Sequence, residues 1–227
     1  PPEALLAALS TGPVGLGDRV GRFDPVLAQR TCRADGLLVK PDVAIAATSA
    51  TVLASPAFNP VPLVAESHSD HPAGRWAYVV AMHSFPGDQE IDATVRLADL
   101  DDAAPEGEVV AWDWRAGTAT RLGPHGEVGG VLAREGWSYH VLAPVLPTGL
   151  AVIGDVDRFV PAGDARVEVS ASDAGARVVV KGAGESVTLT GWAESAPTVD
   201  GVSAAFDRAT GVWRTTVEVP PRGWTLV

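Results

Sequence analysis

Residues 10–42 read STGPVGLGDRVGRFDPVLAQRTCRADGLLVKPD, a stretch that combines a glycine-rich segment, a helix-start signal and a short apolar run. Glycines stand at positions 12, 15 and 17. Glycines at this density are typical of a loop whose backbone turns sharply and can approach a ligand closely. The first half of the stretch is therefore predicted to be a loop, and it ends in the charged pair Asp18 and Arg19.

A short helix is predicted directly after this loop. Asp24 suits an N-cap and Pro25 suits the first helical position, so the helix is expected over residues 26–32. Residues 37–39 read LLV and are expected to form a short buried strand. The apolar run at residues 4–9, before the loop, is either a buried strand or the end of a helix, because periodicity cannot assign a run this short.

The sequence pattern changes after Pro62: short segments that are rich in β-branched residues, or that alternate between apolar and polar residues, are separated by turn residues. Short strands at such spacing, with almost no helical period, are typical of an antiparallel β-sandwich. The expected strands cover residues 63–68, 75–84, 91–97, 109–114, 118–122, 130–134, 138–146, 150–153, 166–170, 177–181, 186–190, 202–206, 212–219 and 224–227.

Two regions are predicted, residues 1–60 and residues 61–227. The segment 43–62 between them is Ala-rich, and its prolines at positions 56, 60 and 62 exclude a helix through its end. Within this connector, residues 43–47 are either an edge strand or an extended strap. A second small sandwich beginning near residue 161 is an alternative division of the C-terminal region.

Bulk composition excludes several classes of function. The 227 residues carry a net charge of −11, which disfavours nucleic acid as a partner because phosphate binding needs a basic surface. No apolar run approaches the ~20 residues of a membrane span, so no membrane partner is expected. Cys32 is the only cysteine, so no intrachain disulfide can form. No cofactor is expected, and the sequence does not indicate a cellular compartment.

Two sets of polar residues could either bind a ligand or belong to ordinary turns. His68, Asp70 and His71 have a spacing that suits a divalent metal, but Pro72 follows at once, and a solvated turn between two strands is the favoured interpretation. No metal site is therefore predicted. Asp35 is either an acid at the rim of a binding site or part of a tight turn, and the turn is favoured.

The seven tryptophans suggest a platform on which a sugar ring could stack. Trp112 and Trp114 lie on the same face of one predicted strand, two residues apart, and are the candidates for such a platform. A β-sandwich also uses buried aromatic residues as core anchors, and this role is favoured for most of the tryptophans.

Three blocks of sequence resemble one enzyme group. STGPVGLGDRVG followed by TCRADGLLVKPD looks like the last strand and loop of the catalytic barrel in glycoside hydrolases of the α-galactosidase and raffinose-synthase type. WSYHVLAPVLPTGLAVIGDVDRFV (137–160) is similar to the sandwich domain that follows the barrel there, and ESHSDHPAGRWAYVVAMHSF (66–85) is the third block. The resemblance implies a mainly β chain: an antiparallel β-sandwich preceded by a short α/β segment from the end of a (β/α)8 barrel.

The same resemblance implies a function. These enzymes cleave or transfer glycosyl units with a pair of carboxyl groups, which sit on earlier barrel strands. No residue of this chain matches either carboxyl position, so no catalytic residue is assigned, and an upstream barrel segment is the expected partner. The carbohydrate substrate, for which an α-galactoside is the candidate, would be contacted by Asp18 and Arg19 at the rim of the loop. The alternative for Asp18 is to cap the next turn or to pair with Arg19. The alternative is a non-catalytic carbohydrate-binding or interaction module; a capsid-like or adhesion sandwich has no support beyond fold class.

Overall fold

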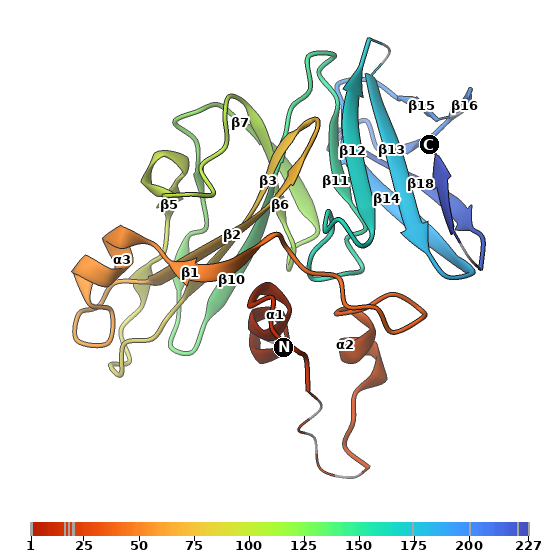
Figure 1. The fold of residues 1–227 in the computed structure, drawn as a ribbon. Helices are drawn as coiled ribbons and strands as arrows, with labels where there is room; N and C mark the ends of the chain where they lie inside the picture. Colours follow the sequence, from red (N-terminus) through yellow and green to blue (C-terminus); the bar gives the residue numbers. More distant parts are fainter. Residues whose placement is uncertain are drawn as a thin grey trace.

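The computed structural model describes residues 2–15, 17, 19, 21–173, 175–199, 201–221 and 223–226. Within them the protein is mainly β, and its paired strands run antiparallel. Figure 1 shows a large sheet on one side, a second group of strands on the other, and two short helices below the junction. This arrangement is sandwich-like and confirms the mainly β, antiparallel prediction.

Residues 43–144 build a six-stranded sheet, in which β10 lies between β3 and β6. Its strands, in spatial order, are β1 (Val43–Ala47), β2 (Leu63–His71), β3 (Gly74–Met82), β10 (Trp137–Pro144), β6 (Val109–Asp113) and β7 (Thr118–Leu122). Because β1 pairs with β2 and forms one edge of this sheet, residues 43–47 are an edge strand rather than a strap.

The strands after residue 150 form two further sheets. One is four-stranded, in the order β11 (Ala151–Gly154), β14 (Glu185–Trp192), β18 (Val212–Val219) and β17 (Ala205–Phe206). The other is three-stranded, in the order β12 (Val167–Ser172), β13 (Gly175–Gly182) and β19 (Gly223–Leu226). These C-terminal strands pair only among themselves within the described residues.

The segment predicted as one strand over residues 91–97 is divided in the structure. Residues there alternate between buried and exposed as predicted, but β4 (Ile91–Asp92) pairs with β9 (Val131–Leu132), and β5 (Val95–Arg96) pairs with β8 (Glu127–Val128). Gly129 lies between the two partner strands, β8 and β9. It has a positive φ and lies so close to the Ala93 carbonyl that a side chain would collide with it. The alternation therefore predicted the buried face correctly and the pairing incorrectly.

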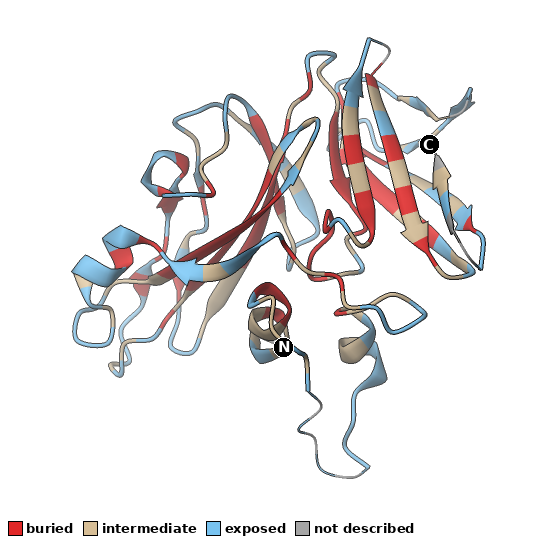
Figure 2. Ribbon diagram, in the orientation of Figure 1, coloured by how far each residue is buried: buried red, intermediate tan, exposed pale blue. Residues whose placement is uncertain are grey.

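The central strands of the six-stranded sheet are buried on both faces, whereas the edge strands β1 and β7 are largely exposed (Figure 2). Along β3, Trp76 and Tyr78 face the main core, which also contains the inward side chains of the C-terminal sheets. Ala77 and Val79 face the opposite way, into a second core. That second core is covered by the segment that contains β4, β5 and the 3-10 turn at Leu97–Asp99.

Three short helices complete the fold: α1 (Pro2–Leu9), α2 (Pro25–Gln29) and α3 (Ser49–Ala54). The side chain of Asp24 accepts hydrogen bonds from the backbone amides of Val26 and Leu27, which confirms the predicted cap. Helix α3 was not predicted; it ends where Ser55 adopts a left-handed conformation, before the first proline of the connector.

Two expectations for the N-terminal segment need correction. Residues 2–9 are helical, so the strand alternative for the apolar run is wrong. The spacing of the buried residues Leu5, Ala8 and Leu9 places them on one face of the helix. Residues 37–39 do not form a strand; they contribute only an isolated bridge between Cys32 and Leu38, although Val39 is buried as expected.

Candidate functional site

The glycine-rich loop lines a hollow of about 420 Å³ together with α1 and α2. Ala4 and Ala7 form the α1 side, and Leu27 and Ala28 form the α2 side. Arg19 is exposed on the loop, whereas Asp18 lies outside the described residues. The structure therefore places the predicted loop beside a shallow, largely apolar hollow, and the proposed sugar contacts of Asp18 and Arg19 stay a prediction.

The two tryptophans proposed as a platform both pack against other side chains. Trp112 is 3% exposed and belongs to the main core. Trp114 is half-buried: the Arg30 guanidinium lies 4.8 Å from the centre of its ring, and the Phe159 ring lies 5.3 Å away. Its indole nitrogen donates to the carbonyl of Arg158 at 3.3 Å. Both side chains therefore pack as core anchors in this structure.

The H-x-D-H group forms the last part of β2, at the turn end of the hairpin with β3. It is not the solvated turn that was predicted, because His68 pairs with Ala77 in the sheet and is buried. Arg75 binds Asp70 with two nitrogens, at 2.7 and 3.0 Å. His71 turns away and donates from Nε2 to the carbonyl of Ala162 at 2.7 Å, with its ring edge-on to Trp76. Among the residues with described positions, no group of three or more His, Cys, Asp or Glu side chains could hold a metal ion.

His71 is thus not the solvated tip residue that was predicted. Burial lowers the pKa of its imidazole, although the bond to Ala162 and the charges of Asp42, Asp164 and Glu168 act in the opposite direction. The neutral ring with hydrogen on Nε2 is the form that suits the Ala162 carbonyl, because a carbonyl oxygen only accepts. His71 therefore ties the hairpin to the C-terminal half.

Asp35 forms the tight turn that was favoured for it. Its carboxylate accepts two hydrogen bonds from Arg33, and Gly36 follows with a φ of 81°. The side-chain hydrogen bond from Arg33 lowers the pKa of the Asp35 carboxyl. The residue is engaged in local structure rather than aimed at a ligand.

A buried ion cluster joins the N-terminal segment to the C-terminal sheets. Arg166, 1% exposed, donates to Asp155 at 2.7 Å and to Glu185 at 2.9 Å. Glu185 also accepts from the backbone amide of Ala34 at 3.2 Å. Burial raises the pKa of Glu185, but its hydrogen bonds to Arg166 and to backbone amides outweigh this effect and lower the pKa. Every charge in this set has a partner, so we assign it a structural role.

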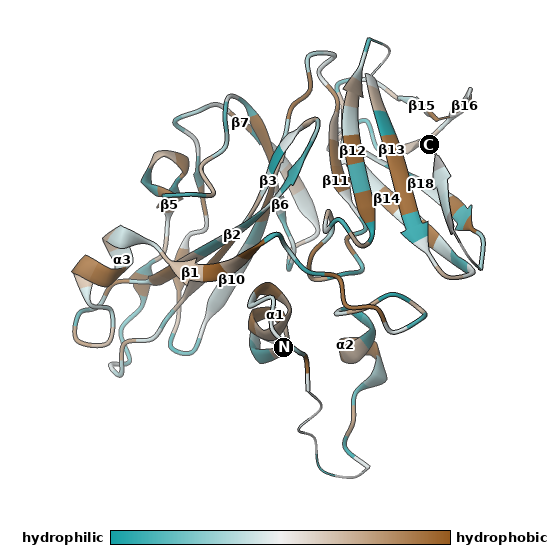
Figure 3. Ribbon diagram, viewed as in Figure 1, coloured by the Kyte–Doolittle hydropathy of each residue, from teal (hydrophilic) through white to brown (hydrophobic). Residues whose placement is uncertain are grey.

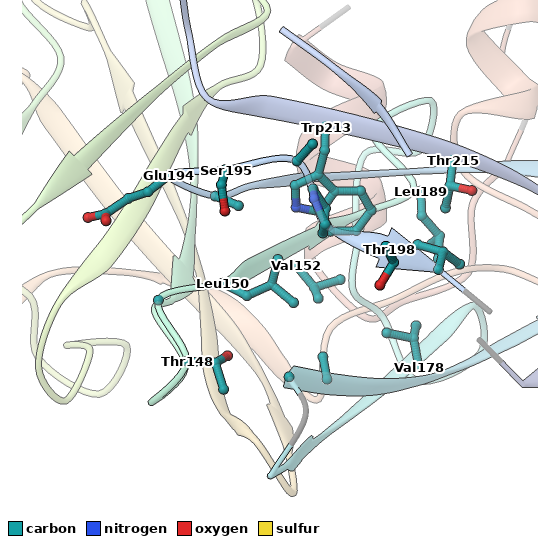
Figure 4. A pocket seen from close by; sticks show the side chains of 17 residues that line it. Thr148, Leu150, Val152, Val178, Leu189, Glu194, Ser195, Thr198, Trp213 and Thr215 are labelled. Carbon is teal, nitrogen blue, oxygen red and sulfur yellow. The ribbon is translucent and has the colours of Figure 1, made fainter. Parts of the chain in front are cut away.

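Sequence reasoning missed a cleft of about 590 Å³ between the two C-terminal sheets (Figure 4). Its apolar side chains come from β11, β13, β14 and β18, and the segment 194–199 and the turn 148–150 close its rim. The feature that could have indicated the cleft is the pairing of Trp213 on β18 with Gly191 on β14, in which a large ring covers a residue without a side chain. That pairing depends on strand register, which a single sequence does not supply.

Comparison with known proteins adds no relative: no family model matches the chain, and no curated protein matches it. Within the described part of the chain, none of the helices has the length and apolar character needed to cross a membrane. What can be said of function therefore depends on the residues and on the geometry described above.

Proposed function

We propose that this chain is the C-terminal portion of a glycoside hydrolase, in which the β-sandwich supports a catalytic barrel formed by an upstream segment. The reaction would be hydrolysis or transfer of a glycosyl unit, with α-galactosides as the first substrates to test. The catalytic carboxyl pair would lie upstream. The sequence blocks that resemble this enzyme group support the proposal.

The observation that carries the proposal is the exposed apolar surface of residues 23–37. Phe23, Val26 and Leu37 are 46%, 60% and 49% exposed, and no residue of α2 is buried. Leu27 of α2 packs partly against the main core, whereas Phe23, Val26 and Leu37 leave much of their apolar surface exposed, so this surface is suited to a further contact. Because residues 2–9 are helical, the barrel contact is proposed for residues 23–37 rather than for a strand at residues 5–9.

A second apolar surface makes a matched comparison possible. Val52, Leu53 and Phe58, on and after α3, are also highly exposed, next to the edge strand β1. Figure 3 shows hydrophobic residues on α3 and β1, and Figure 2 shows that much of this region is exposed. This second surface lies away from α1 and α2 in Figure 1.

The test uses both this chain and the full polypeptide that its gene encodes. We expect the 227-residue chain alone to show no turnover of aryl α-galactosides, and the full polypeptide to carry an upstream segment of alternating strands and helices. The triple variant Phe23→Ser, Val26→Ser, Leu37→Ser should leave the stability of the 227-residue chain nearly unchanged but lower the stability and activity of the full polypeptide. The control triple Val52→Ser, Leu53→Ser, Phe58→Ser should lower the stability and the activity of the full polypeptide less.

Two results would contradict the proposal. Robust turnover by the 227-residue chain would mean that the carboxyl pair is not upstream. A full polypeptide without a barrel-forming segment would favour the second candidate, a non-catalytic binding module. The cleft between the C-terminal sheets is the observation that favours this second candidate, since β-sandwich modules can bind ligands without catalysis.

A further inference from the structure

The cleft between the C-terminal sheets has the dimensions and the floor of a small-molecule site. Its volume of about 590 Å³ falls within the ~300–1,000 Å³ typical of ligand pockets. Val152, Val178 and Leu189 line it, and each is less than 5% exposed. They come from three strands on two facing sheets, so the floor is fixed by the sheets rather than by a loop.

Among the described residues of this buried lining, Trp213 is the one whose side chain carries a polar atom. The residue is 3% exposed, and its Nε1 hydrogen-bond donor has no partner among the described residues. A buried indole N–H usually finds an acceptor. The ring is held in place because it lies directly against Gly191 on the neighbouring strand, where a side chain would collide with it. Figure 4 shows the Trp213 ring among the side chains that line the cleft.

The rim of the cleft is polar. Thr148, Ser195 and Thr198 contribute hydroxyl groups. Among the described lining residues, the only charged one is Glu194, which is bound by Arg121 at 2.6 Å. A charged ligand would lose its hydration against the apolar floor without gaining a counter-ion there. A sugar would likewise place several hydroxyl groups against side chains that cannot hydrogen-bond.

We propose that this cleft binds a small neutral molecule with an apolar body and an oxygen acceptor. The apolar body lies between the two sheets, against Val152, Val178 and Leu189, and the oxygen accepts a hydrogen bond from Trp213 Nε1. This site is independent of the proposed glycoside hydrolase function, because it needs no upstream segment and no catalytic carboxyl group.

Three probes of similar size separate the contributions. Acetophenone has an aromatic body and a carbonyl acceptor, ethylbenzene has the body alone, and benzoate has the body with a charge. The measurement is a ¹H–¹⁵N NMR titration of the 227-residue chain that follows the indole N–H signals, with the signal of Trp213 assigned by its absence in Trp213→Phe. We expect acetophenone to shift the Trp213 signal saturably. Ethylbenzene should bind roughly fivefold more weakly, as the loss of one neutral hydrogen bond implies, and benzoate should not bind.

Two neighbouring substitutions on β13 test the location. Ala176→Leu adds bulk to a residue that lines the cleft and should abolish the acetophenone shift. Arg177→Leu changes the exposed next residue, which does not line the cleft, and should leave the shift intact. Thermal unfolding of both variants confirms that each is folded. If Ala176→Leu does not fold, Trp213→Phe decides: followed through its backbone amide signals, it should bind acetophenone roughly fivefold more weakly than the wild-type chain does.

The proposal fails if acetophenone produces no saturable shift up to its solubility limit, if the shift persists in Ala176→Leu, or if benzoate or methyl α-galactoside binds more tightly than acetophenone. It also fails if the wild-type chain does not distinguish acetophenone from ethylbenzene, since the Trp213 N–H would then contribute nothing to recognition.

Discussion

At the scale of single residues, the structure depends on a few buried polar groups whose partners are specific. Arg166 is the strongest case, because its guanidinium is almost fully buried and donates to both Asp155 and Glu185. Arg158 lies farther from the same carboxylates, at 3.7 and 3.4 Å. Removing Arg166 would leave both carboxylates with only these longer ion pairs in a mostly buried place, which costs more than the loss of a surface ion pair.

The first prediction concerns this arginine. Arg166→Met should lower the free energy of unfolding by up to about 3–5 kcal/mol, because two carboxylates lose their closest buried partner and keep only the longer contacts with Arg158. Arg96→Met is the matched control: Arg96 pairs with Glu127 at 3.3 Å on the surface, and its loss should cost less than about 1 kcal/mol. Urea denaturation at neutral pH measures both. Equal losses in the two variants would mean that burial does not strengthen the Arg166 contacts.

The second prediction concerns His71 and pH. Burial lowers the pKa of this imidazole below the ordinary value of 6.5, so the unfolded chain takes up a proton more readily than the folded protein. Stability contributed by the neutral ring is therefore fully present above that pH and is lost as the pH falls from about 6.5 toward the folded pKa.

The measurement compares the free energy of unfolding at pH 7.5 and pH 5.0. The decline on acidification should be smaller in His71→Gln, which can still donate to the Ala162 carbonyl but cannot titrate. His125→Gln, an exposed loop variant, should decline as much as the wild type. His140 also has a pKa lowered by burial, partly opposed by Asp113, so some acid sensitivity should remain in His71→Gln. An unchanged decline in His71→Gln would contradict the assignment.

At the scale of elements, the pairing of β14 with β18 sets both the register of a sheet and the shape of the cleft. Gly191 faces Trp213 across this pair, and it also lies against the carbonyl of Ala151 on the other side. There is no room for even a methyl group between a fixed backbone and a packed indole. The glycine is therefore required by close packing and not by an unusual backbone angle.

The third prediction follows from this crowding. Gly191→Ala should lower the free energy of unfolding by at least about 1–3 kcal/mol, the usual cost of overpacking a core, and should move the indole N–H signal of Trp213. Gly123→Ala is the control, because a methyl group there would meet open space and should change stability by less than about 0.5 kcal/mol. A Gly191→Ala protein as stable as the wild type would show that the sheet adjusts without strain.

Local sequence patterns predicted the positions of several strands and of a helix start well, but they did not predict which strands pair with one another. The bounds of β7 and β18 agree with the predicted segments 118–122 and 212–219, because turn residues mark the ends of these strands. The helix start at Asp24 was also predicted, since a cap is a local hydrogen-bond pattern. The divided strand at residues 91–97 was not, because its division depends on Gly129 in a distant segment.

The candidate sites show the same limit. The tight turn at Asp35 was predicted because its hydrogen bonds are made within a few residues. The contact of His71 with Ala162 joins residues 91 positions apart, and the cleft joins strands from two sheets. Neither could be predicted without knowing which strands face one another.

At the scale of the whole molecule, α1 packs into the main core together with residues from the rest of the chain. Leu5 and Leu9 are fully buried and share that core with Trp76 of the six-stranded sheet and Trp213 of the C-terminal sheets. Figure 1 shows α1 below the junction of the two groups of strands. A helix in this position stabilises both groups at once.

The fourth prediction tests this role. Leu9→Ala should lower the free energy of unfolding by about 2–5 kcal/mol, as expected for a large-to-small change in a packed core. Leu53→Ala, at a side chain 85% exposed on α3, should change stability by less than about 0.5 kcal/mol. Both changes are measured in urea on the 227-residue chain. A Leu9→Ala protein that unfolds like the Leu53→Ala control would mean that α1 is an appendage.

The position of α1 also has a consequence for biosynthesis. The core that receives Leu5 and Leu9 includes Val219, which the ribosome adds more than two hundred residues later. At about 5–20 residues per second, that interval is roughly 10–40 s. Throughout that interval the nascent helix has no finished core to enter, so its leucines stay available to chaperones until Val219 and the other late core residues have been synthesised.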